Sequence, residues 1–179
     1  MAGHTPSQTV GPYFRIGLDW PDAWRVATDN TPGVPLTLVG RVLDGDGQPV
    51  SDALVELWQA DADGRYPAPG AQGFSGLGRC GVDAAGEFRF VTVKPGAVAA
   101  PGGGLQAPHL NLVVMARGLL THLHTRVYFP GDETAQDADP VLACVPAARR
   151  ATLRARVEGD VHRFDIHLQG EHETVFLAL

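Results

Sequence analysis

Lysine is almost absent from this chain, and the lack of it limits which partners the protein can have. Lys94 is the only lysine among 14 basic residues, so arginine carries nearly all of the positive charge. Arginine favours planar, bidentate contacts with carboxylates rather than a diffuse cationic surface. The formal net charge is also -6. We therefore expect no nucleic-acid partner.

Cysteine and long apolar runs are scarce as well. Cys80 and Cys144 form neither a disulfide framework nor a metal-binding spacing, which favours two reduced thiols in a cytoplasmic protein. The first ten residues, MAGHTPSQTV, lack the basic start and apolar centre of a signal peptide. No apolar run approaches the length of a membrane span. We expect a cytoplasmic chain with no membrane partner.

Glycine and proline, in contrast, are abundant, with 22 and 14 residues respectively in a chain of 179. They separate many short runs of β-branched and aromatic residues, which is typical of all-β sandwiches and barrels. We expect one all-β domain over 1–179, a β-sandwich with long loops. An extended N-terminal arm should occupy 1–35. A short helix, opened by Pro146, is expected over 146–156.

Three further segments have clear sequence signals. The strand expected over 53–61 places Glu56 beside apolar neighbours, so this carboxylate needs a partner such as an arginine. The acidic run 132–140 is expected to be a solvated loop. Beyond it, strands are expected over 161–170 and 173–179.

The most informative stretch runs from 107 to 132, APHLNLVVMARG followed by LLTHLHTRVYFPGD. It predicts two strands joined near Arg117 and Gly118. Because side chains alternate between the faces of a strand, His109 and Asn111 should share one face of the first strand. The pair His122 and His124 should share one face of the second strand, together with Arg126 and Tyr128.

The residues alone leave two interpretations of these pairs open. Histidines two apart on a strand point the same way and are common metal ligands, so His122, His124 and Tyr128 could start a metal site. The alternative is an amphipathic strand with a polar outer face. Nothing in the sequence places the further ligands that the metal site would need.

Taken together, the motifs resemble the intradiol ring-cleaving dioxygenases, in order and over nearly the whole chain. Within that family the chain is most similar to the α-type subunits that pair with an iron-binding β subunit. The segments that carry the resemblance include TPSQTVGPYF, LVGRVLDGDGQPVSDALVELWQAD, GRY, GEFRFVTVKPG, APHLNLVVMARG and HLHTRVYFPGD.

In catalytic members of the family, two tyrosines and two histidines bind a non-haem ferric ion. Matched residue by residue, these ligand positions fall on Tyr66, Val98, His109 and Asn111, and an arginine of the same motif falls on Gln106. Valine has no donor atom, and an amide is a weaker ligand for Fe(III) than imidazole. The resemblance therefore implies that this chain does not hold iron, that the β subunit binds the Fe(III), and that His122 and His124 are structural.

The resemblance also implies what an α-type chain contributes. The active site would lie at the interface between the two subunits, in a hetero-oligomer of αβ units, and this chain would form part of the substrate pocket. The assembly would cleave 3,4-dihydroxybenzoate with O2 to 3-carboxy-cis,cis-muconate, a step in the β-ketoadipate pathway of aromatic catabolism. Substrate contacts would come from Thr9, Gly11, Pro12, Tyr13 and Arg117.

Two rival functions remain at this stage. A β-sandwich that only binds a ligand would be a stable monomer on its own. A self-sufficient metalloenzyme would bind metal through His122 and His124 without any partner chain.

Overall fold

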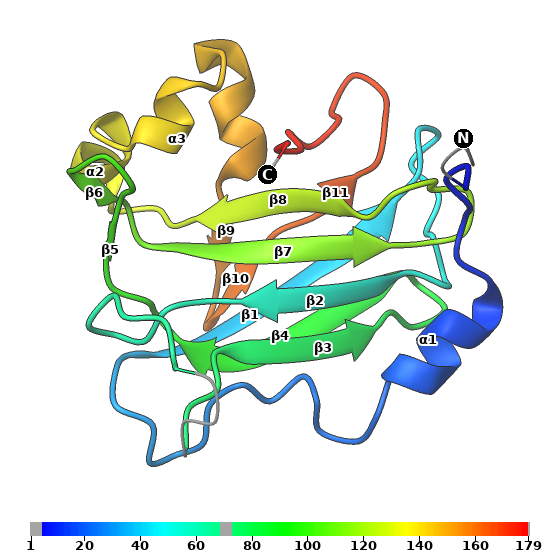
Figure 1. The fold of residues 1–179 in the computed structure, drawn as a ribbon, viewed down its shortest axis with the longest axis horizontal. Coiled ribbons are helices and arrows are strands. Elements are labelled where there is room, and N and C mark those ends of the chain that lie inside the picture. Colours follow the sequence, from blue (N-terminus) through cyan, green and yellow to red (C-terminus); the bar gives the residue numbers. More distant parts are fainter. Residues whose placement is uncertain (1–4, 69–72, 179) are drawn as a thin grey trace.

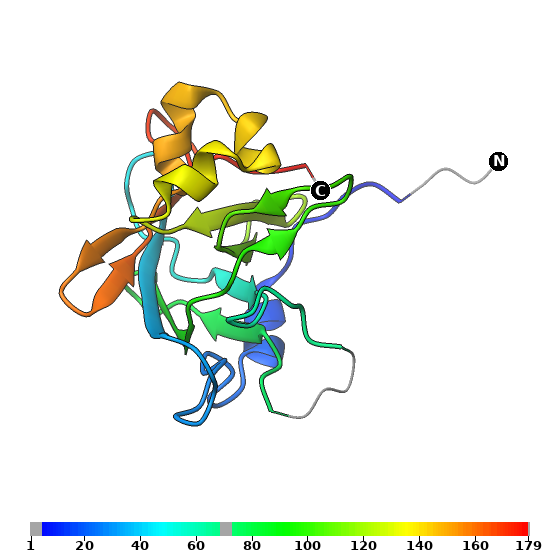
Figure 2. The same ribbon diagram turned by 90° about the vertical axis from the view of Figure 1, so that its left-hand side faces the viewer.

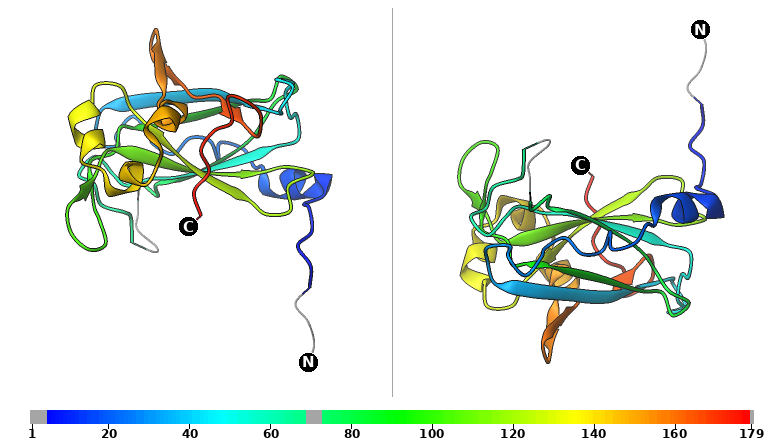
Figure 3. Two further views of the ribbon diagram at one scale, coloured as in Figure 1. Left: turned by 90° about the horizontal axis from the view of Figure 1, so that it is seen from above. Right: turned by 90° about the horizontal axis from the view of Figure 1, so that it is seen from below.

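The body of the protein is two β-sheets packed face to face (Figures 1 and 3), in a computed structural model that describes residues 5–68 and 73–178. All neighbouring strands of the first sheet are antiparallel, in the order β3-β2-β7-β8. These strands are β2 (Leu54–Trp58), β3 (Leu77–Gly81), β7 (His109–Met115) and β8 (Leu123–Tyr128). The prediction of an all-β sandwich is confirmed.

The second sheet is built around β1 (Pro35–Leu43). Its other strands are β4 (Glu87–Val93), β9 (Arg156–Glu158), β10 (Val161–Arg163) and β11 (Ile166–His167). Strand β4 runs antiparallel along one edge of β1, and β10 and β11 pair in parallel with successive parts of the other edge. Between them the chain passes so close to β1 that a Cβ at Gly40 would lie 1.8 Å from the Phe164 carbonyl oxygen. Only glycine fits there.

The core lies between the two sheets and follows from the alternation along their strands. In β7, Leu110, Leu112 and Val114 are fully buried, whereas the residues between them face outward. Phe88 and Phe90 of β4 fill the opposite side of the core. The outward face of β7 therefore carries His109 and Asn111, as the sequence predicts.

The connection between β3 and β4 crosses from one sheet to the other, so these two strands do not pair with each other. An Asp83 turn makes the crossing, with its carboxylate accepting from the backbone N–H groups of Ala85 and Glu87 at 2.8 and 2.9 Å. Within the first sheet, Arg79 lies directly opposite Glu56 and forms an ion pair with it. The predicted need of Glu56 for an arginine is confirmed.

The helices correct two predictions from the sequence. The arm is not extended throughout, because Pro12–Leu18 form the helix α1 with Pro12 at its first position, where a missing N–H costs nothing. The run 132–140 is not a solvated loop, because it contains α2 (Glu133–Asp137) and the start of α3 (Pro140–Ala143). The helix expected after Pro146 is present as η1 (Ala147–Leu153), a 3-10 helix.

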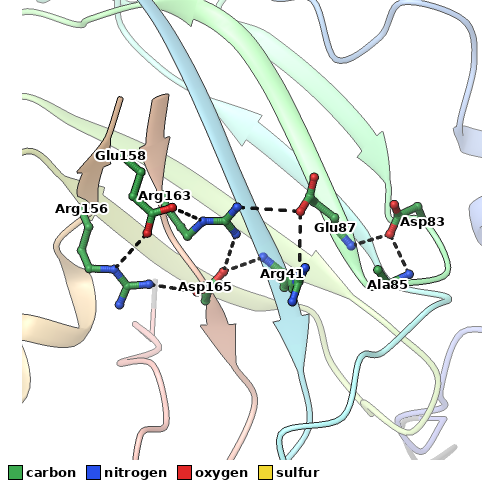
Figure 4. A network of polar contacts seen from close by, with 8 residues as sticks. All are labelled: Arg41, Asp83, Ala85, Glu87, Arg156, Glu158, Arg163 and Asp165. Atoms are coloured by element: carbon green, nitrogen blue, oxygen red, sulfur yellow. Dashed lines mark hydrogen bonds and ion pairs between the residues drawn. The ribbon is translucent and has the colours of Figure 1, made fainter. Parts of the chain in front are cut away.

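The C-terminal prediction is only partly right. Strands β10 and β11 fall within 161–170, but 173–178 forms no strand. This segment joins β8 through an isolated bridge between Leu177 and His124 and through a hydrogen bond from the Thr125 hydroxyl to the Val175 carbonyl. On the outer side of the second sheet, ion pairs join β9, β10, β1 and β4, with Arg163 between Glu158 and Asp165 and Glu87 between Arg163 and Arg41 (Figure 4). None of the helices in 5–68 and 73–178 is long and apolar enough to cross a membrane.

Candidate functional site

The register between β7 and β8 brings two polar pairs together on the outward face of the first sheet. His109 lies opposite Tyr128, with ring centroids 5.9 Å apart, and Asn111 lies opposite Arg126. Directly opposed residues on one face of an antiparallel pair are close enough for their side chains to interact. We call the group formed by Tyr66, His109, Asn111, Arg126 and Tyr128 the β7 cluster.

Tyr66 reaches this cluster from the loop after β2. The loop turns at Asp61, whose carboxylate accepts from the backbone N–H groups of Asp63 and Arg65. At Gly64, φ is +79° and a Cβ would lie 1.9 Å from the Ala97 carbonyl oxygen, so glycine is required. The turn delivers Tyr66 onto Trp58, with the ring centroids 5.4 Å apart and the rings nearly parallel.

A chain of hydrogen bonds then runs across the cluster. The Asn111 amide nitrogen donates to the Tyr66 hydroxyl at 2.8 Å and to the Trp58 carbonyl at 3.1 Å. The Arg126 Nε donates to the Asn111 amide oxygen at 3.1 Å, and a terminal guanidinium nitrogen donates to the Tyr128 hydroxyl at 3.4 Å. Both ends of the Asn111 side chain are therefore occupied within the protein.

His109 and Tyr128 are held in their neutral forms. Burial lowers the pKa of His109 to about 4, and the positive charge of Arg126 acts in the same direction. Its Nδ1 lies 2.7 Å from the Ala107 carbonyl oxygen, which fixes the ring proton on that nitrogen. The buried Nε2 has no hydrogen-bond partner among the described residues. Burial raises the pKa of Tyr128 to about 12, so its hydroxyl stays protonated.

Val98 and Gln106 face each other on the small ladder of β5 (Val98–Ala99) and β6 (Leu105–Gln106). The Val98 side chain is buried and apolar, and it brings no donor atom. The Gln106 side-chain oxygen is buried without a hydrogen-bond partner in the described part of the chain.

A second group of predicted residues lies where the arm meets the turn between β7 and β8. The Thr9 hydroxyl accepts from the backbone N–H of Gly118 at 2.7 Å, which ties the arm to this turn. The Arg117 Nε pairs with Asp52, and no bond joins the terminal guanidinium nitrogens to any other described residue. We call this group the arm surface, made of Thr9, Gly11, Pro12, Tyr13 and Arg117.

Two residues of the arm surface are strongly exposed. The Tyr13 side chain is 83% exposed, and the Arg117 side chain is 64% exposed. Gly11 precedes α1, and the first described residues of the arm extend away from the body of the molecule (Figure 2). Beneath the arm, Val10, Phe14 and Leu119 help to line a hollow of about 230 Å³.

The structure does not bring the two groups together. His109 begins β7, whereas Arg117 lies beyond the other end of the same strand. At roughly 3.3 Å per residue of extended chain, the separation is on the order of 25 Å. The predicted ligand positions and the predicted substrate contacts of this chain therefore lie in different parts of the structure.

Comparison with known proteins decides the family. A family model described as Dioxygenase matches residues 10–170, and the alpha chain of protocatechuate 3,4-dioxygenase from Burkholderia cepacia is 47% identical over 193 residues. That alignment covers 96% of this chain and 95% of the relative. The chain belongs to the intradiol dioxygenase family.

Two further relatives place the chain within the intradiol dioxygenases. The beta chain of protocatechuate 3,4-dioxygenase from Burkholderia cepacia is 37% identical over 161 residues, covering 79% of this chain and 67% of that relative. A solved dioxygenase domain from Streptomyces sp. SirexAA-E superposes with a TM-score of 0.61 at 32% identity, covering 93% of this chain and 98% of that one. The sequence resemblance to an α-type intradiol chain is confirmed.

The β7 cluster does not fit the ferric ion of intradiol dioxygenases. Of the four matched positions, Val98 has no donor atom, and both the nitrogen and the oxygen of the Asn111 amide are hydrogen-bonded to other protein groups. Arg126 places a fixed positive charge against the same residues, which opposes binding of another cation.

The alternative pair, His122 and His124, does not form a metal site with Tyr128 either. Their rings lie 4.8 Å apart, edge to face, and burial lowers the pKa of His124, with the charge of His122 acting the same way. Tyr128, the third residue of that hypothesis, is fully buried and accepts from Arg126. The described residues contain no group of three or more His, Cys, Asp or Glu side chains that could hold a metal ion.

Sequence reasoning placed Arg126 on the correct face of β8 but gave it no role. Its importance follows from register: once His109 pairs with Tyr128, Asn111 must face Arg126. Asp52 was missed because it comes from the distant connection into β2, and no local pattern indicates its ion pair with Arg117.

Proposed function

We propose that this chain is the α subunit of a protocatechuate 3,4-dioxygenase, and that it completes the substrate pocket of an iron-binding β subunit. The assembly cleaves 3,4-dihydroxybenzoate with O2 to 3-carboxy-cis,cis-muconate. In this proposal the ferric ion and the chemistry with O2 belong to the partner chain. This chain positions the substrate and shields it from water.

The observation that carries the proposal is the exposure of the arm surface and its distance from this chain's own ligand positions. The Thr9 contact to Gly118 joins arm and turn into one surface, and the first described residues of the arm extend beyond this surface, away from the body (Figure 3). A surface of this shape suits a site completed by another chain. Similarity to both the alpha and the beta chains of the enzyme from Burkholderia cepacia supports a hetero-oligomer of αβ units.

Arg117 suits the carboxylate of 3,4-dihydroxybenzoate. Asp52 holds its Nε, which orients the guanidinium while the terminal nitrogens remain free to donate to a ligand. A charge-assisted hydrogen bond of this kind contributes roughly 1.5 to 3 kcal/mol. Gly11 and Tyr13 lie on the same surface and would line the pocket wall beside the ring.

The proposal is tested in the αβ complex with Arg117→Ala. We expect KM for 3,4-dihydroxybenzoate to rise roughly 10- to 100-fold, the equivalent of one charge-assisted hydrogen bond. Iron content should not change. Catechol lacks the carboxylate, so its cleavage should change much less, and steady-state kinetics with both substrates measure the difference.

Arg89→Ala is the matched control, since Arg89 is exposed on β4 in the other sheet. It should leave KM for both substrates unchanged. Equal losses with catechol and 3,4-dihydroxybenzoate would show that Arg117 does not recognise the carboxylate. Loss of iron from the Arg117→Ala complex would contradict the assignment of the metal to the partner chain.

The rival functions are separated by purifying the chain alone and after co-expression with a β chain. Tyrosinate bound to Fe(III) gives a strong visible absorption, so we expect a colourless chain alone and a coloured complex. A coloured or metal-loaded chain alone would support the self-sufficient metalloenzyme with His122 and His124. A stable monomer that does not associate with the β chain would support a binding module.

A further inference from the structure

Arg126 is a buried cation in the middle of the β7 cluster. It is 8% exposed, although it lies on the outward face of β8. Its Nε donates to the Asn111 amide oxygen at 3.1 Å, and a terminal nitrogen donates to the Tyr128 hydroxyl at 3.4 Å. Through Asn111 it is linked to the Tyr66 hydroxyl, 2.8 Å from the amide nitrogen.

The partners of this guanidinium are neutral. Among the described residues, no carboxylate forms an ion pair with Arg126. The buried carboxylate of Asp139 is linked to the guanidinium only through Tyr128, whose hydroxyl accepts from Arg126 and hydrogen-bonds to Asp139. Asp139 otherwise accepts from backbone N–H groups, including that of Ala107. Burying a charge without an opposite charge is costly unless its surroundings are organised to accept it.

The surroundings of Arg126 are the residues at the matched ligand positions. Asn111 is one of them and accepts from the guanidinium, and Tyr66 is a second and accepts from Asn111. His109 is a third, beside Tyr128 on the adjacent rung of the same ladder. The residues at these ligand positions thus place oxygen and nitrogen acceptors around the positive charge of the Arg126 guanidinium.

We propose that Arg126 is the resident cation of the β7 cluster, replacing a metal ion and excluding one. The guanidinium holds Asn111 and Tyr128 by direct hydrogen bonds and Tyr66 indirectly through Asn111, and its charge repels an incoming metal. Loss of two ligands is therefore only part of the reason why the cluster holds no iron. This inference rests on the proposal that the iron belongs to the partner chain.

Restoring the two missing ligands distinguishes occupation of the site by Arg126 from simple loss of ligands. If missing ligands were the whole cause, Val98→Tyr with Asn111→His would restore a two-tyrosine, two-histidine set and iron would bind. If Arg126 occupies the site, the same double variant should remain without iron. Removing the guanidinium as well, by Arg126→Gln, should then allow metal to enter.

The experiment compares these variants in the co-expressed αβ complex, by iron content per αβ unit and by tyrosinate absorption. We expect the double variant to match the wild type and the triple variant to gain iron above it. Arg65→Gln added to the double variant is the matched control, because Arg65 is adjacent to Tyr66 yet its side chain is 76% exposed. That control should gain none.

A smaller change guards against misfolding of the triple variant, since Tyr at position 98 enters a buried site. Asn111→His is made with and without Arg126→Gln, and Co(II) binding is followed by its visible absorption. We expect a Co(II) signal only when Arg126 is replaced.

Two results would overturn the inference: equal iron in the double and triple variants, or no gain of iron or Co(II) in either variant lacking Arg126. A wild-type chain that binds iron when purified alone would instead overturn the proposed function. The two failures are therefore distinguishable.

Discussion

Burial of His109, a residue at a matched ligand position, makes the free energy of unfolding depend on pH. In the unfolded chain its imidazole has its ordinary pKa of 6.5, whereas burial lowers the pKa in the folded protein to about 4. As the pH falls from 6.5 to about 4, the imidazole therefore becomes protonated in the unfolded chain but stays neutral in the folded protein. The stabilisation is complete above about pH 6.5 and is lost progressively toward pH 4, by about 3 kcal/mol in total.

His109→Gln should flatten this part of the pH dependence. We expect the free energy of unfolding of the isolated chain, measured in urea, to fall less between pH 7 and pH 4 in the variant than in the wild type. His172→Gln is the control, since His172 is exposed near the C-terminus. If His109→Gln and His172→Gln have the same pH dependence, burial of His109 does not govern its protonation.

For single residues, the sequence predicted the face of the strand on which a side chain lies better than it predicted the role of that side chain. Strand alternation correctly placed His109 and Asn111 on the outward face of β7. The hydrogen bonds of Asn111 to Tyr66 and Arg126 depend on a loop turn and on cross-strand register. Neither is contained in the local pattern of residues around Asn111, so the role of Arg126 could come only from the structure.

Among the elements, the segment from α2 to α3 departs most from its predicted form. Its acidic composition suggested a solvated loop, yet Asp139 is fully buried. The carboxylate caps α3 by accepting from the N–H groups of Val141 and Leu142, and it also accepts from Ala107 at 2.8 Å. The following Pro140, at the first helical position, was a signal for this cap.

Asp139→Ala should destabilise the protein strongly. The change removes a helix cap and leaves the buried N–H of Ala107 unpaired, which together amount to about 3 kcal/mol. Thermal and urea unfolding measure the loss. Asp137→Ala, at an exposed position in α2, should stay within about 0.5 kcal/mol of the wild type. Similar losses in both variants would contradict a specific role for the buried carboxylate.

Across the whole molecule, β7 separates the β7 cluster at its start from the arm surface beyond its end. The sandwich class was predictable because turn residues and alternation recur along the entire chain. The separation was not, since it depends on where Thr9 of the arm is fastened, and Gly118 is 109 residues further along. One chain thus carries the β7 cluster, with its buried Arg126, at one end of β7 and the exposed arm surface at the other.

The last prediction concerns assembly. Helix α1 presents Ile16, which is 71% exposed, beside the arm surface. Exposed apolar side chains grouped on one element mark an interaction surface. We expect Ile16→Asp to weaken association with the β chain at least tenfold, because a charge would be buried in the interface. Thermal unfolding of the chain alone should not change, since Ile16 packs little within it.

Val34→Asp is the matched control, because Val34 is 68% exposed in the loop before β1. Titration calorimetry or analytical ultracentrifugation with the β chain compares the two variants. Weaker association for Ile16→Asp alone places α1 in the subunit contact, next to the pocket that we propose Arg117 completes. Equal association of both variants would mean that α1 lies outside the contact, and the arm surface would then lose its role in the partner's site.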